Sequence, residues 1–152
     1  MPRPMSPQRE REYEELHGFL DFIATHVSEI DPANPLHPTN VGKQIIALYG
    51  KSKALDGLKQ AVNDTVEMFE RHPLEYVCRL DVALRERGLA TLSEIRRRYA
   101  STYRRILKRG NIKTETEYYL VAGVLADLAA NVTKDERAQL EILSASYSGR
   151  DA

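Results

Sequence analysis

The sequence predicts an all-α protein, a compact bundle of about six to seven helices without a sheet. Three observations support this prediction. Apolar residues recur at spacings of three and four along most of the chain. Residues that start and stop helices bracket these stretches at short intervals. No segment alternates apolar and polar residues for long enough to form a strand. With 152 residues, of which 42% are hydrophobic and 29% charged, we expect a single globular domain over residues 7–149.

A short arm and a long helix open the chain. Residues 1–6 are predicted to be a disordered N-terminal arm. Ser6 followed by Pro7 is typical of a helix start, and the helix is expected over residues 7–31, ending where Asp31 precedes Pro32. Its apolar residues form a seam of coiled-coil type: Tyr13, Leu16, Leu20, Ile23, Val27 and Ile30. This seam either packs within the domain or pairs with a second copy, so a homodimer through the first helix is one alternative.

A stiff proline-rich connector over residues 32–38 is predicted to lead into a helical core over residues 39–149. The first helix of this core should end at Gly50, and a later one should end with Gly88 at the C′ position. Three further helix starts each combine a threonine with a glutamate three residues on, which is the capping-box pattern. These pairs are Thr91/Glu94, Thr114/Glu117 and Thr133/Glu136.

The zero net charge conceals an uneven distribution. Residues 1–90 carry 11 basic and 14 acidic side chains, residues 91–113 carry 8 basic and 1 acidic, and residues 114–152 carry 3 basic and 7 acidic. The middle segment is therefore a local source of strong positive potential. We predict one continuous amphipathic helix over residues 92–109. Its inner face should carry Leu92, Ile95, Tyr99, Tyr103 and Ile106. Its outer face should carry a cationic ridge about 20 Å long. The tentative binding residues of this ridge are Arg97, Arg98, Arg104, Arg105, Lys108 and Arg109.

Residues 91–110 also resemble, in part, the helix-turn-helix of small transcription regulators. A Ser-Glu-Ile start and an Ile-Leu-Lys-Arg end carry the resemblance. No Gly or Asn stands between Tyr99 and Thr102 to make the turn, and the helical period is unbroken there. The sequence therefore predicts one continuous helix, and we assign no family.

Catalytic and metal-binding patterns are weak. Gly50-Lys51-Ser52 lacks the glycine and the preceding strand of a phosphate-binding loop. Glu14 and His17 form a single Glu-x-x-His pair, whereas a di-iron bundle needs two. Cys78 is the only cysteine, so an intrachain disulfide is excluded. We interpret it as a small buried hydrophobe. We therefore predict no catalytic residues, no metal site and no cofactor, although a site assembled from distant helices would not show in the sequence.

The sequence favours a non-enzymatic interaction or regulatory protein that docks an anionic partner through its basic helix. The partner would be an acidic protein surface or a nucleic acid, and direct DNA or RNA binding by residues 92–109 is the first alternative. A small enzyme or metalloprotein with a site between helices is the second. A further alternative is that the ridge pairs with acidic helices of the same chain. The lone cysteine, the absence of a secretory segment and the lack of a long apolar run predict a cytoplasmic protein with no membrane partner.

Overall fold

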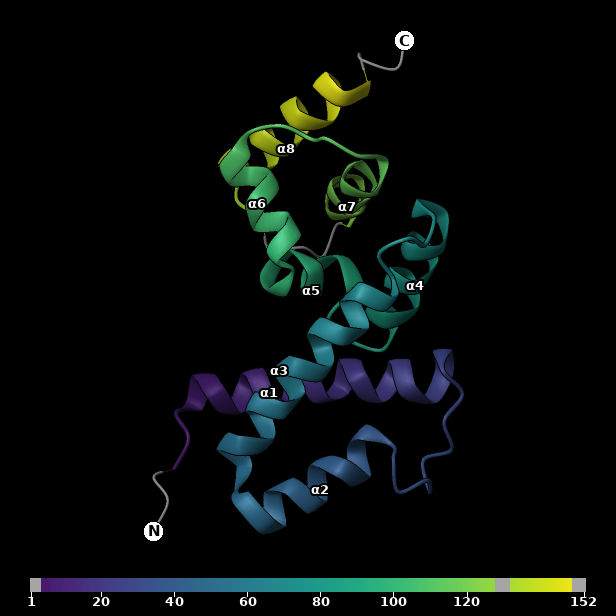
Figure 1. The fold of residues 1–152 in the computed structure, drawn as a ribbon, viewed down its shortest axis with the longest axis vertical. Helices are drawn as coiled ribbons and strands as arrows, with labels where there is room; N and C mark the ends of the chain where they lie inside the picture. Colours follow the sequence, from purple (N-terminus) through teal and green to yellow (C-terminus); the bar gives the residue numbers. More distant parts are fainter. Residues whose placement is uncertain (1–3, 128–131, 149–152) are drawn as a thin grey trace. The chain divides into compact units, whose positions relative to one another are not determined.

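The computed structural model describes residues 4–127 and 132–148, and within them the chain is helical without any strand. Eight α-helices and one π-helical segment follow one another (Figure 1). The all-α prediction is confirmed. The helix count of six to seven is too low, because the predicted basic helix is divided in two.

The chain forms two compact units, residues 1–65 and residues 66–152, and each is described by itself. The single domain predicted over residues 7–149 stays a prediction. Of the predicted disordered arm, residues 1–3 lie outside the described residues. Residues 4–6 have no regular secondary structure.

The first unit begins with α1 (Pro7–Phe22), which continues as the π-helical segment η1 (Ile23–Val27). The side chain of Ser6 caps α1 by accepting a hydrogen bond from the backbone N–H of Arg9, as its sequence predicts. The predicted helix end at residue 31 is wrong, because the chain leaves the helix after Val27. Glu29 adopts a left-handed conformation with φ of 54°, and the N–H of Ile30 reaches back to the carbonyl of Ala24. That bond spans one residue more than the long bond of a Schellman motif, and the left-handed position after a helix is usually occupied by glycine.

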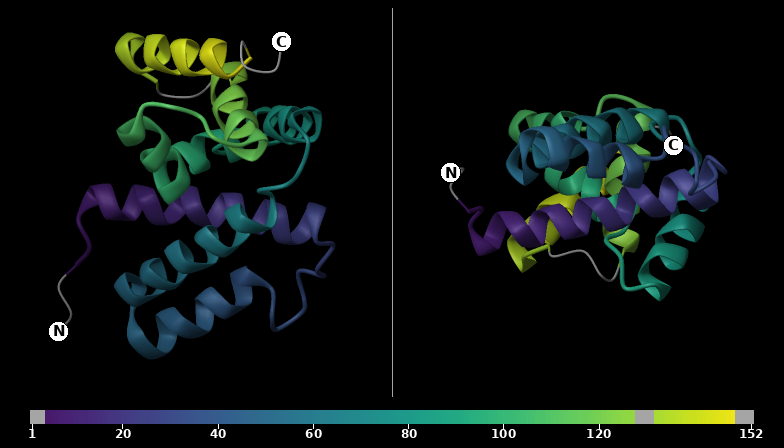
Figure 2. Two further views of the ribbon diagram at one scale, coloured as in Figure 1. Left: turned by 45° about the horizontal axis from the view of Figure 1, so that its top comes forward. Right: turned by 90° about the horizontal axis from the view of Figure 1, so that it is seen from below.

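Helices α2 (Pro38–Tyr49) and α3 (Lys51–Met68) are separated only by Gly50, whose φ of 90° turns the chain at the predicted stop (Figure 2). The connector before α2 consists of turns, and its last residue, Pro38, is already the first residue of the helix. Residue 37 caps that helix, so the predicted start of the helical core at residue 39 is one residue late.

Buried His37 connects three parts of this unit. Its Nδ1 accepts a hydrogen bond from the N–H of Thr39, which caps α2. The ring proton must therefore lie on Nε2, which donates to the hydroxyl of Thr25 in η1 at 2.8 Å. Nε2 also lies 3.8 Å from the carboxylate of Asp21 in α1. The histidine thus ties the connector to α1, η1 and α2, a role that no spacing in the sequence indicated.

The predicted dimer seam is largely inaccessible in this structure. Tyr13, Leu16, Leu20 and Ile23 are buried within the chain, whereas Val27 and Ile30 are half-buried. Packing within the chain is therefore the alternative that the structure displays. A homodimer through these residues stays a prediction, and it would require α1 and η1 together to expose four buried side chains.

The second unit contains α4 (Leu74–Glu86), α5 (Leu92–Tyr99), α6 (Ser101–Arg109), α7 (Glu115–Ala126) and α8 (Lys134–Ser148). Helix α7 packs against α4, α5, α6 and α8. Gly88 lies at the C′ position of α4 with φ of 70°, as predicted. Gly110, with φ of 82°, ends α6 directly after residue 109, the predicted last residue of the basic helix. Over residues 4–127 and 132–148, no helix is long and apolar enough to cross a membrane.

Candidate functional site

The basic segment is two helices meeting at one extended residue. Ala100 has ψ of 119°, which ends α5 and serves as the N-cap of α6. The prediction of one continuous helix over residues 92–109 is therefore wrong. Alanine is not a helix-breaking residue, and Ala100 is buried. We therefore attribute the change of direction to tertiary packing around this residue. The predicted inner face is buried at Leu92, Ile95, Tyr103 and Ile106, on both sides of the break, whereas Tyr99 is only half-buried.

The cations of α5 are held within the unit. Arg96 is only 3% exposed and donates a hydrogen bond to the carbonyl of Phe69 at 2.6 Å. Arg97 makes two hydrogen bonds to the carboxylate of Glu94, at 2.9 and 2.7 Å, and Arg98 makes a third at 2.9 Å. Burial alone would raise the pKa of Glu94, but the hydrogen bonds from Arg97 and Arg98 outweigh it and leave that pKa below its usual value. Two of the six predicted ridge residues are thus internally paired.

The last cation of α6 is also paired. Arg109 contacts the carboxylate of Glu117 and donates to the backbone and side-chain oxygens of Asn111. Glu117 in turn accepts the N–H of Lys113 at 2.8 Å. Burial acts to raise the pKa of Glu117, but these hydrogen bonds and the nearby guanidinium lower it overall. Arg109 therefore stabilises the turn between α6 and α7.

The three remaining ridge residues, Arg104, Arg105 and Lys108, are exposed on consecutive turns of α6. We call them the α6 patch. Arg105 donates to the hydroxyl of Thr102 at 3.2 Å. Over residues 4–127 and 132–148, none of the three lies within ion-pair distance of an acidic side chain, and α6 itself contains no acidic residue. The structure therefore brings together three of the six predicted residues as a cationic surface.

The threonine half of each predicted capping box is confirmed. Thr91, Thr114 and Thr133 each accept a hydrogen bond from the backbone N–H three residues later. The glutamates serve other partners as well. Glu136 accepts a hydrogen bond from Tyr103 at 2.6 Å and lies 3.6 Å from Arg97. Burial and the hydrogen bond to Glu136 raise the pKa of the Tyr103 phenol, so it acts as a hydrogen-bond donor.

Two buried aspartates form a polar cluster that the sequence analysis missed. Asp81, on α4, accepts hydrogen bonds from the backbone N–H and the hydroxyl of Ser93 at 3.2 and 2.5 Å, and thereby caps the start of α5. Burial raises the pKa of Asp81 to about 6, against the opposing effect of these hydrogen bonds. Asp127, at the end of α7, accepts from Thr91 and from Arg85, the latter at 2.6 Å.

A signal for both aspartates exists in the sequence. Asp81 stands four residues after Val77 and three before Leu84, and Asp127 stands three residues after Val124. These spacings place each carboxylate on the buried face of its helix. A charged residue on an apolar face predicts a buried partner. Here the partners are Ser93 and Thr91 at the start of α5 and, for Asp127, also Arg85 of α4.

The residues considered as catalytic or metal-binding candidates lie in contacts of structural kind. Cys78 is half-buried instead of fully buried, and burial, followed by Asp81 and Asp127, raises the pKa of its thiol. Lys51 pairs with Glu10 at 2.5 Å and lies 4.8 Å from the ring centroid of Tyr13. In the part of the chain that the structure describes, no three potential ligands form a group that could hold a metal ion.

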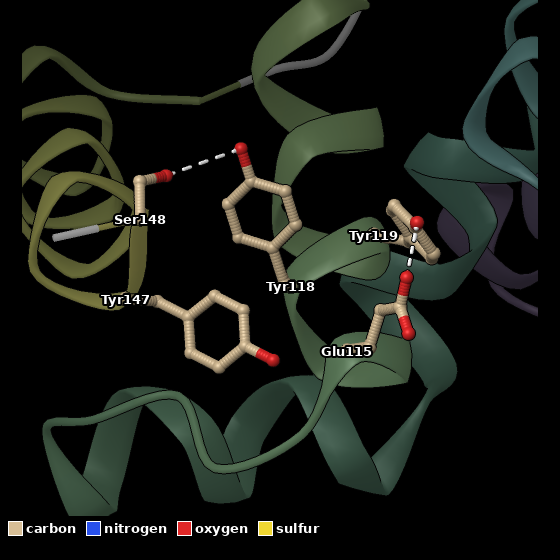
Figure 3. A pocket seen from close by; sticks show the side chains of 5 residues that line it. All are labelled: Glu115, Tyr118, Tyr119, Tyr147 and Ser148. Atoms are coloured by element: carbon tan, nitrogen blue, oxygen red, sulfur yellow. Dashed lines mark hydrogen bonds between the residues drawn. The ribbon is translucent and has the colours of Figure 1, made fainter. Parts of the chain in front are cut away.

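An open hollow of about 530 Å³ lies between the start of α7 and the end of α8 (Figure 3). It is lined by Glu115, Tyr118, Tyr119, Tyr147 and Ser148. The rings of Tyr118 and Tyr147 are stacked, with centroids 5.2 Å apart and planes inclined by 27°. Tyr119 donates a hydrogen bond to Glu115 at 2.5 Å, and this bond raises the pKa of the phenol. No pattern in the sequence groups these residues, which lie on two helices.

Comparison with protein-family models, with curated proteins and with solved structures finds no match for this chain. Its candidate sites therefore rest on the geometry of its own residues: the α6 patch, the buried aspartates and the tyrosine hollow.

Proposed function

We propose that this is a non-enzymatic interaction protein that docks an anionic partner through the α6 patch. The observation that carries the proposal is the contrast among the predicted ridge residues. Arg97, Arg98 and Arg109 have carboxylate partners, whereas Arg104, Arg105 and Lys108 are exposed without one among the described residues. Internal pairing therefore accounts for half of the predicted ridge and not for the other half.

The chemistry of the patch suits a partner rich in carboxylates or phosphates. Two guanidinium groups can each form paired hydrogen bonds to such oxygens, and a lysine adds a point charge on the next turn. Because the three cations are exposed, a partner would find them without first breaking an ion pair. Their interaction should weaken steeply with salt, since exposed charges are screened over about 10 Å at 0.1 M ionic strength.

A second candidate is duplex nucleic acid, and the helix break at Ala100 favours it. The break makes α6 a separate short helix with Ser101 and Thr102 at its start, next to the cations. A helix that enters the major groove places its first residues against base edges and uses neighbouring cations for phosphates. Tyr103 is buried, so contacts would involve phosphates and base edges without stacking on this ring.

A charge-reversal experiment tests both versions. The variant Arg104→Glu, Arg105→Glu, Lys108→Glu is compared with the control Lys43→Glu, Lys53→Glu, Lys134→Glu, which changes three other exposed cations. Fluorescence anisotropy measures binding to a short DNA duplex, an RNA duplex and an acidic peptide at increasing salt. Circular dichroism should show both variants to be folded, because all six side chains are exposed.

We expect the wild-type chain and the control to bind at least one of the three anions at low salt, and the α6 variant to lose that binding. If B-DNA is the partner, three phosphate contacts predict a slope of about −2.7 for log K against log salt concentration. Binding of the peptide alone would identify an acidic protein surface. Absence of saturable binding to every probe, or equal binding by the α6 variant, would overturn the proposal.

A further inference from the structure

The last turn of α2 exposes apolar side chains to solvent. Leu48 is 73% exposed, Tyr49 is 71% exposed, and Ile46 is exposed as well. Helix α3 folds back along α2, so this turn lies at the closed end of a helical hairpin (Figure 1). A Cβ atom at Gly57 would lie 3.8 Å from Cδ1 of Ile45, so the two helices pack against each other close to the turn. We call the three exposed side chains at this end the α2 tip.

The α2 tip surrounds the end of the helix and does not form a stripe along it. Successive residues of an α-helix point about 100° apart, so its three side chains face different directions. A partner that offers a groove to a helix contacts residues spaced by three, four and seven positions. In α2 such a set is Val41, Ile45 and Leu48, of which the first two are half-buried within the chain. The convex tip therefore suits a fluid apolar medium and not a rigid protein groove.

The sequence around the tip is basic. Residues 32–55 contain no aspartate or glutamate, although the chain has 22 of them in 152 residues. Lys43 on α2 and Lys53 on α3 are both exposed, and neither forms an ion pair within residues 4–127 and 132–148. Residues 1–3, which belong to the same unit, carry no acidic side chain either.

The acidic side chains that contact the start of α3 are occupied by other cations. Glu10 and Glu14 of α1 pair with Lys51, and Asp56 lies 3.6 Å from Arg9. They leave the charges of the two exposed lysines uncompensated. Two copies of the tip placed against each other would bring these lysines together, whereas an anionic surface would attract all of them. Charge complementarity therefore favours an anionic surface over a second copy of this chain.

We propose that the α2 tip inserts into the interface of an anionic lipid bilayer. Its leucine and isoleucine enter the boundary between head groups and acyl chains, where tyrosine is also favoured, and the lysines reach the anionic head groups. The expectation of no membrane partner rested on the lack of a long apolar run, which an interfacial tip does not need. The proposal does not rest on the α6 patch.

Tryptophan fluorescence can locate the tip in a bilayer, because the chain contains no tryptophan. Tyr49→Trp places one reporter in the tip, and Ile142→Trp places a control reporter at an exposed position of α8. The vesicles contain phosphatidylcholine and about a quarter phosphatidylserine, with bromine atoms on the acyl chains. We expect vesicles to shift the emission of Tyr49→Trp to shorter wavelength and to quench it in a saturable manner. The emission of Ile142→Trp should not be quenched.

Three changes to the Tyr49→Trp chain test the parts of the site, and circular dichroism should show each variant to be folded because every changed side chain is exposed. Leu48→Gln should weaken vesicle binding about tenfold. Lys43→Glu with Lys53→Glu should remove the preference for phosphatidylserine over phosphatidylcholine alone. Arg104→Glu, Arg105→Glu and Lys108→Glu together should leave the quenching intact, which separates this proposal from the function proposed for the α6 patch.

Several outcomes would overturn the proposal. Short-wavelength emission of Tyr49→Trp without vesicles would show that the tip is already covered, by a second copy if the emission depends on protein concentration and by the same chain if it does not. A larger emission shift with an acidic amphipathic peptide than with vesicles would assign the tip to a protein partner. Absence of quenching, equal quenching of both reporters, or loss of quenching in the α6 variant would also refute insertion of the tip.

Discussion

Asp81 should make the stability of this protein depend on pH in an unusual direction. Its carboxyl is 3% exposed, and burial raises its pKa from 3.8 to about 6. Because the folded-state pKa is above the unfolded-state value, the folded chain holds this proton more tightly than the unfolded chain. The resulting stabilisation is complete below pH 4 and is lost as the pH rises through about 6. The difference of about two pKa units corresponds to about 3 kcal/mol.

The substitution Asp81→Asn isolates this effect. An asparagine keeps one oxygen for the backbone N–H of Ser93, and the Ser93 hydroxyl can rotate to accept from the new amide. The variant lacks the ionisation, so its free energy of unfolding relative to the wild type should increase by about 2.4 kcal/mol between pH 4 and pH 7. Urea denaturation followed by circular dichroism measures this difference.

Glu86→Gln on the same helix is the matched control, because Glu86 is exposed. The stability of the Glu86→Gln variant relative to the wild type should vary little over the same pH range. If the free energies of unfolding of Asp81→Asn and the wild type differ by the same amount from pH 4 to pH 7, Asp81 does not hold its proton more tightly in the folded chain. Burial would then not raise the pKa of Asp81.

Three further substitutions test other contacts, each by chemical denaturation at neutral pH. His37→Ala removes the cap of α2 and should lower the free energy of unfolding by about 2 kcal/mol. His37→Asn keeps an acceptor for the N–H of Thr39 and should lower it less. Equal losses of stability in the two variants would argue against the capping role. Glu94→Ala removes the carboxylate that accepts hydrogen bonds from Arg97 and Arg98 and should cost about 3 kcal/mol, while Arg104→Ala should change stability by less than about 0.5 kcal/mol. Similar effects of the two substitutions would contradict the division of the ridge. Tyr103→Phe removes a single part-buried hydrogen bond and should cost about 1 kcal/mol, and no loss would show that this bond contributes nothing.

The sequence predicted the features of this fold that depend on neighbouring residues. The hydroxyl caps at Ser6, Thr91 and Thr114, and the stops at Gly88 and Gly110, are all present, because each depends on the conformation of a few consecutive residues. The inner face of the basic segment was also predictable, since helical periodicity persists within each of its two halves.

The features that the sequence did not predict depend on contacts between distant segments. Alanine favours helices, so nothing at Ala100 indicates a break, and the break accompanies burial of that residue in the folded unit. The early end of the first helix depends on Glu29, a residue that rarely adopts a left-handed conformation. Asp81 and Asp127 are 46 positions apart in the sequence, and both accept hydrogen bonds from residues at the start of α5. The pairing of such residues is set by tertiary packing, which periodicity does not describe.

The break at Ala100 has a practical consequence for mapping partners with fragments. In the folded unit, Glu136 of α8 contacts Arg97 before the break and Tyr103 after it, so part of what fixes this corner comes from outside the segment. A synthetic peptide of residues 91–110 lacks that brace and the surroundings of Ala100. Its own preferences favour one straight helix, on which all six arginines and lysines of the predicted ridge would line up. Such a peptide would display a surface that the intact protein never presents, and could capture nucleic acid or acidic proteins that the protein itself does not bind.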